Sequence, residues 1–217
     1  MKKIIIGIII VILIGAGYLI LNNPTPNNPE LNQVPTDAIL ESGEYTITPE
    51  TTVNWQANRP LMENYQDTGT IAISQGNVSV TDQGVTGTIQ LDMSSIAALT
   101  TGTGGGQEGL TRHLKSADFF EVETYPTAIF VISEVTETEN QGTYTAQGNL
   151  TLKETTLPLS FPVTLYTEGD VLHINGIANV DRTLWGVQYG SGKFFDSIGE
   201  KMINDIFTVV IDITAQK

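Results

Sequence analysis

Apolar and polar residues alternate along most of the chain beyond residue 40. The most regular run covers residues 157–166, where the apolar positions are Leu157, Leu159, Phe161, Val163 and Leu165. A period of two residues with one apolar face predicts β-strands in a sheet that is covered on one side. The same pattern predicts strands at residues 44–48, 52–57, 69–74, 78–81, 89–93, 127–135, 143–153, 172–180 and 207–213.

Short turn signals separate many of these strands. They are Gln75-Gly76-Asn77, Asp82-Gln83-Gly84, Asn140-Gln141-Gly142 and Glu168-Gly169-Asp170. Such short links join neighbouring strands as hairpins, so we predict antiparallel pairing. About eight strands of this kind form either a closed barrel or a sandwich, and we favour the barrel. Helix is predicted only near residues 107–115, with a further turn near residues 197–203.

Two prolines single out one of the strands. Pro158 and Pro162 lie on the same face of the strand at residues 157–166. Each lacks the N–H group that a strand donates to its neighbour, and proline is therefore confined to sheet edges and irregular positions. We expect this strand to lie at an edge or to splay outward at the prolines.

The N-terminus predicts a membrane anchor. Lys2 and Lys3 precede an uncharged apolar run at residues 4–21, which as a helix would be about 27 Å long at 1.5 Å per residue. This nearly matches a hydrocarbon core of about 30 Å, and the lysines orient the rest of the chain outward. We predict an uncleaved signal anchor at residues 1–21. The alternative is secretion after cleavage near Gly15-Ala16-Gly17.

The anchor defines the rest of the organisation. Residues 22–36 are rich in proline and asparagine and predict an extended linker. Residues 37–217 then form the folded domain, which is long enough to hold its own hydrophobic core. The expected location is the cell membrane, as a single-pass protein whose C-terminal domain is extracytoplasmic, in the periplasm or at the cell surface.

The composition of the chain argues against several classes of function. The formal charge is −14, and a body this acidic disfavours binding to nucleic acid. The chain contains no cysteine, which excludes disulfides, a thiol nucleophile and a cysteine metal site. His113 and His173 are the two histidines, and the sequence shows no convergent partners for either. We expect neither an enzyme nor a bound metal or cofactor.

Several motifs together resemble one family. Residues 113–120, His-Leu-Lys-Ser-Ala-Asp-Phe-Phe, are followed by Tyr125-Pro126 and Phe130, and residues 148–153 lead into Thr156-Leu-Pro-Leu159. Near the C-terminus stand Asp181-Arg-Thr-Leu-Trp-Gly-Val187, Gly190-Ser-Gly-Lys-Phe-Phe195 and Ile198-Gly199. From about Gly43 onward the chain resembles the YceI family of bacterial envelope proteins, whose lipocalin-like antiparallel barrel binds polyisoprenoid lipids. Glu154 is a departure, because the family usually has glycine there.

The resemblance implies a cavity along an eight-stranded lipocalin-like barrel that holds an extended isoprenoid chain. Aromatic residues gather at the segment junctions: Trp55, Phe119, Phe120, Phe130, Phe161, Trp185, Phe194 and Phe195. From this set we expect Phe119, Phe120, Phe130, Phe161 and Trp185 to form the apolar lining. His113 and Arg182 are weaker candidates for a polar end, because packing or capping explains His113 and a fixed turn explains Arg182.

The expected function is to sequester or carry an isoprenoid-type lipid, such as a quinone or a polyprenyl carrier. The alternative is a tethered structural or adhesion domain with a filled core and no ligand. The resemblance also makes a homodimer plausible.

Overall fold

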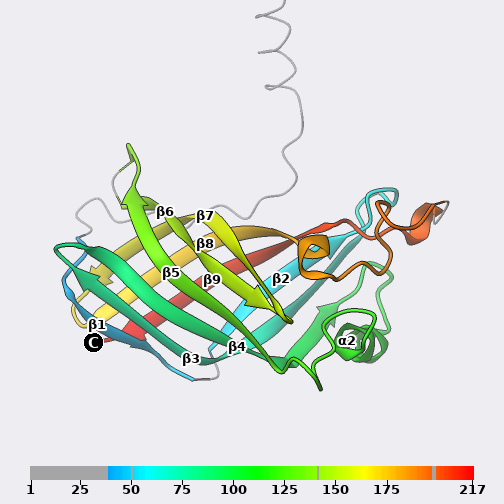
Figure 1. The fold of residues 1–217 in the computed structure, drawn as a ribbon, viewed down its shortest axis with the longest axis horizontal. Coiled ribbons are helices and arrows are strands. Elements are labelled where there is room, and N and C mark those ends of the chain that lie inside the picture. Colours follow the sequence, from blue (N-terminus) through cyan, green and yellow to red (C-terminus); the bar gives the residue numbers. More distant parts are fainter. Residues whose placement is uncertain (1–38, 50, 141, 197–198) are drawn as a thin grey trace, which may run out of the picture. The chain divides into compact units, whose positions relative to one another are not determined.

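The computed structural model describes residues 39–49, 51–140, 142–196 and 199–217, and strands dominate this part of the chain (Figure 1). The elements in chain order, with α for α-helix and η for 3₁₀ helix, are β1 (Gly43–Ile47), β2 (Thr52–Asn58), β3 (Gln66–Thr81), β4 (Gly84–Thr100), α2 (Gln107–Lys115), β5 (Thr127–Glu137), β6 (Thr143–Leu152), β7 (Thr155–Glu168), β8 (Val171–Asp181), η1 (Arg182–Trp185), η2 (Gly199–Lys201) and β9 (Ile206–Gln216).

The strands form one closed antiparallel sheet. Their order is β1-β3-β2-β9-β8-β7-β6-β5-β4, and β4 pairs back with β3. The short strands β1 and β2 both lie between β3 and β9, where each pairs with a different stretch of those two strands. Nine strands therefore occupy eight positions around the barrel, which confirms the predicted eight-stranded antiparallel barrel. All of these pairings lie within residues 43–216, so the barrel closes without the residues before 39.

The predicted helix is confirmed at Gln107–Lys115. None of the helices in the described ranges is long and apolar enough to cross a membrane. The predicted anchor at residues 1–21 and the linker at residues 22–36 fall outside the described residues and stay predictions.

The predicted turn at Gln75-Gly76-Asn77 is wrong. These residues lie within the continuous strand β3, where the pairing with β4 shifts register between Ile73 and Gln75. Such a shift is a bulge or irregularity that bends a strand without ending it. Gly76 has a packing reason, because a Cβ atom there would lie 2.6 Å from Cδ1 of Ile47 on β1. The glycine thus marks a close approach of two strands.

The prolines of β7 lie along an incomplete seam of the barrel, the stretch where β7 and β8 are neighbours but do not pair. β7 pairs with β6 over residues 155–164 but with β8 only over residues 163–168. Leu165 donates its N–H to Gly142, on the β6 side. The N–H groups of successive residues in a strand point alternately to its two neighbours. Pro158 and Pro162 are an odd number of positions from Leu165, so their nitrogens face β8. The missing donors therefore lie on the side where pairing is lost, and the predicted local edge is confirmed.

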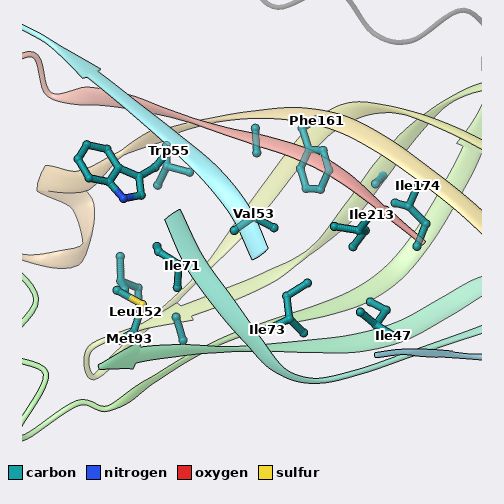
Figure 2. Close-up of a cluster of buried hydrophobic side chains, with 14 of the residues drawn as sticks. Ile47, Val53, Trp55, Ile71, Ile73, Met93, Leu152, Phe161, Ile174 and Ile213 are labelled. Carbon is teal, nitrogen blue, oxygen red and sulfur yellow. The ribbon is translucent and has the colours of Figure 1, made fainter. Parts of the chain in front are cut away.

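The core fills the inside of the barrel. Inward residues of opposite strands meet there, among them Ile73, Leu152, Phe161, Ile174 and Ile213 (Figure 2). Helix α2 lies against β4 near one end of the barrel (Figure 1), where the Thr111 hydroxyl accepts the N–H of Ala98 at 2.9 Å. The chain then turns back, with Phe120 donating its N–H to Leu114 at 3.1 Å. This return places Phe119 and Phe120 at the end of the core.

Candidate ligand cavity

An apolar cavity of about 170 Å³ lies inside the barrel. Its wall extends from Val78 and Val85, beside the β3–β4 hairpin, to Phe119 and Phe120 at the end near α2. The walls are almost entirely aliphatic and aromatic, and Trp55, Arg182 and Asn204 are the polar residues among them. The interior is therefore suited to an elongated apolar group.

Part of this wall is incompletely covered by protein. Twelve apolar lining residues are only half-buried: Ala57, Ile89, Leu91, Phe130, Ile132, Val135, Leu150, Leu159, Ile203, Phe207, Val209 and Ile211. Close-packed interiors leave few voids larger than a water molecule. Half-buried apolar residues that face a cavity therefore indicate an interior whose own side chains do not fill it.

Phe119 and Phe120 line the end of the cavity near α2, and both are buried. The ring of Phe120 contacts Phe207 of β9, with centroids 6.4 Å apart. Phe119 lies against Tyr189 and His113, at centroid distances of 5.3 and 4.9 Å. The pair therefore joins the α2 segment to β9 and to the loop after β8.

Phe130 and Phe161 face each other across β6. Their rings lie 5.4 Å apart between centroids, and both line the cavity. Gly148 of β6 makes room for this pair, because a Cβ atom there would lie 2.7 Å from Cζ of Phe130. Four of the five predicted lining residues therefore share one cavity, contributed by β5, β7 and the segment after α2.

Trp185 and His113 lie outside this lining. Trp185 follows β8 in η1 and is buried, and its indole N–H donates to the Leu150 carbonyl of β6 at 3.1 Å. It thereby ties the end of β8 to β6 next to the incomplete seam. Nε2 of His113 lies 2.9 Å from the Asp118 carboxylate, and its ring packs edge-on against Phe119. The structure thus gives both residues packing contacts.

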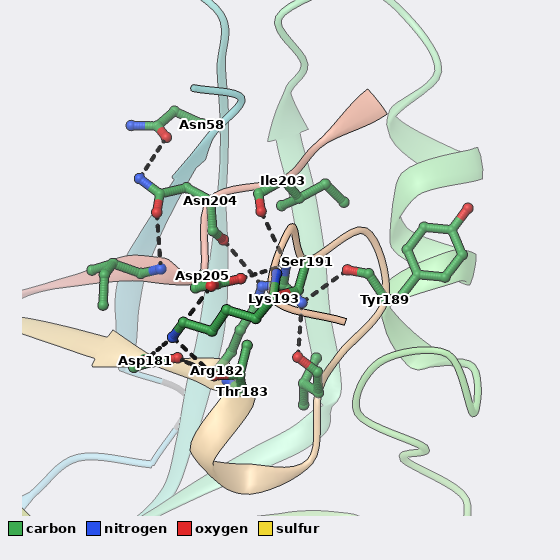
Figure 3. A network of polar contacts seen from close by, with 12 residues as sticks. Asn58, Asp181, Arg182, Thr183, Tyr189, Ser191, Lys193, Ile203, Asn204 and Asp205 are labelled. Atoms are coloured by element: carbon green, nitrogen blue, oxygen red, sulfur yellow. Dashed lines mark hydrogen bonds and ion pairs between the residues drawn. The ribbon is translucent and has the colours of Figure 1, made fainter. Parts of the chain in front are cut away.

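Arg182 belongs to the cavity wall, but its donors are engaged by protein. The side chain is buried, with Nε donating to Asn204 at 3.1 Å and Nη1 donating to Val187 and Tyr189 at 2.8 and 2.9 Å (Figure 3). Nη2 donates to the Ile203 carbonyl at 3.2 Å. All four acceptors are backbone carbonyls, so Arg182 holds two loops together.

Carboxylates surround this arginine. Nη2 of Arg182 lies 3.7 Å from Asp205, and Lys193 lies 3.3 Å from Asp205 and 2.8 Å from Asp181 (Figure 3). Burial lowers the pKa of Arg182, while Asp205 and Asp181 oppose that shift. Burial raises the pKa of Asp181, but hydrogen bonds from Lys193 and Thr183 outweigh it, so the pKa is lowered overall. The charges of the network therefore pair with one another, while Asp205 Oδ1 is buried and accepts no hydrogen bond.

Trp55 is one of the aromatic residues at the segment junctions, and it is not among the residues predicted to form the lining. Trp55 lines the cavity from β2 and is 5% exposed, and its Nε1 has no hydrogen-bond partner. The ring fits because Gly69 on β3 has no side chain, and a Cβ atom there would lie 2.4 Å from Cζ2 of Trp55. An unpaired buried N–H costs about 1–3 kcal/mol. The alternation along the strand could have predicted whether the side chain of Trp55 points into or out of the barrel, but not that its N–H has no partner.

A family model described as the YceI-like domain matches residues 45–215. The chain belongs to the YceI-like family. The departure at Glu154 is harmless to its barrel, because the turn between β6 and β7 places its positive φ of 54° at Lys153 and none at Glu154. Position 154 therefore needs no glycine.

Solved structures share the YceI-like fold. BcnA of Burkholderia cenocepacia is 18% identical with a TM-score of 0.58, covering 76% of this chain and 96% of its own. A polyisoprenoid binding domain from Saccharophagus degradans is 10% identical with a TM-score of 0.56, covering 79% and 97%. The Campylobacter jejuni YCEI protein is 10% identical with a TM-score of 0.50, covering 89% and 94%. Comparison with curated proteins gives no match.

Proposed function

We propose that this protein is a membrane-tethered extracytoplasmic lipid-binding protein. It holds the chain of an isoprenoid-type lipid, such as a quinone or a polyprenyl carrier, inside the barrel and performs no covalent chemistry. The observation that carries the proposal is the apolar cavity with half-buried walls. The family membership and the likeness to a polyisoprenoid binding domain support the same ligand class.

The energetics require a ligand with more than one isoprene unit in the cavity. A buried methylene contributes about 0.8 kcal/mol, so one five-carbon unit contributes about 4 kcal/mol. Association costs roughly 4 kcal/mol or more in lost freedom. One unit therefore only offsets the cost of binding, and affinity is expected to rise with tail length until the cavity is full.

The size of the cavity favours the alternative function. A volume of about 170 Å³ is below the roughly 300–1,000 Å³ typical of small-molecule pockets. A ligand-free structural or adhesion domain would have such a nearly filled interior. The two functions differ in whether lipid enters the barrel, and this can be measured directly.

The decisive experiment uses residues 37–217, which contain the whole closed barrel. The purified fragment is incubated with isoprenoids of increasing tail length and analysed by native mass spectrometry and solvent extraction. Lipid bound in a one-to-one complex supports the carrier function. No bound lipid at any tail length would establish the filled structural domain instead.

Two variants that replace an alanine with leucine test whether the lipid binds inside the barrel. Ala178→Leu places a larger side chain on the cavity wall, whereas Ala72→Leu enlarges a half-buried residue that does not line the cavity. The proposal expects Ala178→Leu to lose bound lipid and Ala72→Leu to retain it. Equal loss in both variants would place the lipid outside the barrel.

A further inference from the structure

The indole N–H of Trp55 is an unused hydrogen-bond donor in an otherwise apolar chamber. Figure 2 shows the indole nitrogen on the side of the ring toward Leu152 and Met93, which are also cavity residues. Trp55 is 95% buried on the basis of its 5% exposure, and Nε1 has no partner. Buried donors in proteins are nearly always paired, so an unpaired one calls for an explanation.

The other polar side chains of the wall already have partners. Arg182 donates to four backbone carbonyls. Asn204 donates from Nδ2 to Asn58 and accepts the N–H of Ile206 at Oδ1. Among the described lining residues, Trp55 therefore carries the single buried side-chain donor without a partner. A trapped water needs two or more polar partners, and the side chains of this wall offer only this one.

We propose that Trp55 Nε1 binds a neutral oxygen acceptor of the ligand, namely a carbonyl of a quinone-type head group, and so places that head inside the barrel near Trp55. This inference rests on the proposed function and selects between its two ligand classes. The donor is uncharged, and the one cation of the wall, Arg182, is engaged by protein. A phosphate head would enter this wall without an available counter-charge, which is costly in an apolar site.

The location of Trp55 sets the orientation of the tail. Trp55 pairs with Gly69 of β3 and Val209 of β9. The cavity continues past Ile73 toward Val78 and Val85 at the opposite end. A head group at Trp55 therefore directs its isoprenoid tail along the barrel toward the β3–β4 hairpin.

The test is direct because the chain has only two tryptophans. Uniformly ¹⁵N-labelled fragment 37–217 should give two indole N–H signals, and Trp55→Phe identifies the one from Trp55. The probes are a naphthoquinone with an isoprenyl tail, the naphthalene with the same tail, and a polyprenyl phosphate of equal tail length. Either aromatic probe should move the Trp55 signal when it binds, but only the quinone should shift the indole proton downfield, as a hydrogen bond does.

The affinities supply a second measurement. One neutral hydrogen bond corresponds to roughly a 3- to 10-fold change in affinity. Trp55→Phe should reduce the ratio of quinone to naphthalene affinity by this factor, whereas Phe161→Leu should weaken both probes alike and leave the ratio unchanged.

Several results would overturn the inference. They are an unmoved Trp55 signal with bound quinone, an unchanged affinity ratio in Trp55→Phe, and tighter binding of the phosphate than of the quinone. In each of these cases lipid still binds and the proposed function stands. Failure of all three probes to bind would instead remove the proposed function, and this inference with it.

Discussion

Replacing Arg182 with leucine should destabilise the barrel strongly without acting through a ligand. The substitution removes the donor from four backbone carbonyls, those of Val187, Tyr189, Ile203 and Asn204. These carbonyls belong to two loops that are separate in sequence. The arginine is 3% exposed, so its loss leaves the acceptors in a region that water reaches poorly.

The magnitude follows from the partners that remain. Asp205 keeps Lys193 at 3.3 Å but loses the guanidinium at 3.7 Å. Removing one member of a buried ion pair costs about 3–5 kcal/mol. For a domain of this size, 1 kcal/mol shifts Tm by roughly 2–4 °C, so Arg182→Leu should lower Tm by roughly 6–20 °C.

Thermal unfolding followed by circular dichroism on fragment 37–217 measures this shift. Lys193→Met is the matched control, because Lys193 is half exposed and contacts the same carboxylates. Because an exposed ion pair contributes only about 0–1 kcal/mol, Lys193→Met should lower Tm far less than Arg182→Leu does. The reasoning would be refuted if Arg182→Leu kept its Tm but lost bound lipid, because Arg182 would then serve the ligand rather than the fold.

Three further predictions concern the same barrel. Pairing between Asp181 and Lys193 lowers the pKa of the aspartate and raises the pKa of the lysine. The pair should therefore stabilise the fold fully between their ordinary pKa values of 3.8 and 10.5, and this stabilisation should fade as pH falls below 3.8 or rises above 10.5. A Tm difference between wild type and Lys193→Met that grew below pH 3.8 would contradict this. Gly148→Ala should cost about 1–3 kcal/mol in urea unfolding through overpacking, because its Cβ would lie 2.2 Å from a backbone oxygen, whereas Gly109→Ala in the open surface of α2 should be neutral or stabilising. Trp185→Phe should lower the unfolding free energy by about 1 kcal/mol through the lost hydrogen bond to β6, and unchanged lipid affinity in this variant would confirm that the indole lies off the binding surface.

The barrel was predictable because its signal is local. Strict alternation identifies the inward residues of β7 and β9, and short turns make their neighbours antiparallel. The glycine at position 76 misled the prediction, because a turn and a close approach to Ile47 both require a small residue. The short strands β1 and β2 share one place in the barrel, next to β3. This arrangement depends on pairing with strands distant in sequence, so no local pattern predicts it.

The candidate site was less predictable because it depends on contacts between distant residues. Phe119 and Phe120 were assigned to the lining from a motif, and the structure places both there. Trp185 and Trp55 both follow apolar patterns in the sequence. The indole of Trp185 donates to Leu150, whereas the indole N–H of Trp55 is unpaired inside the cavity. Only the three-dimensional structure distinguishes these two roles.

The seam between β7 and β8 shows what a proline pattern can and cannot determine. Pro158 and Pro162 are four positions apart, an even spacing, so both missing donors face the same neighbour. The sequence therefore predicts that this strand lies at an edge or splays outward at the prolines. It does not reveal that this edge lies within a closed barrel, because closure depends on the pairing of β3 with β4 on the other side. Trp185 of η1 is buried and donates its indole N–H to Leu150 of β6, the strand that pairs with β7 on its other side. The same indole that the motif suggested as a ligand contact thus makes a structural contact with β6.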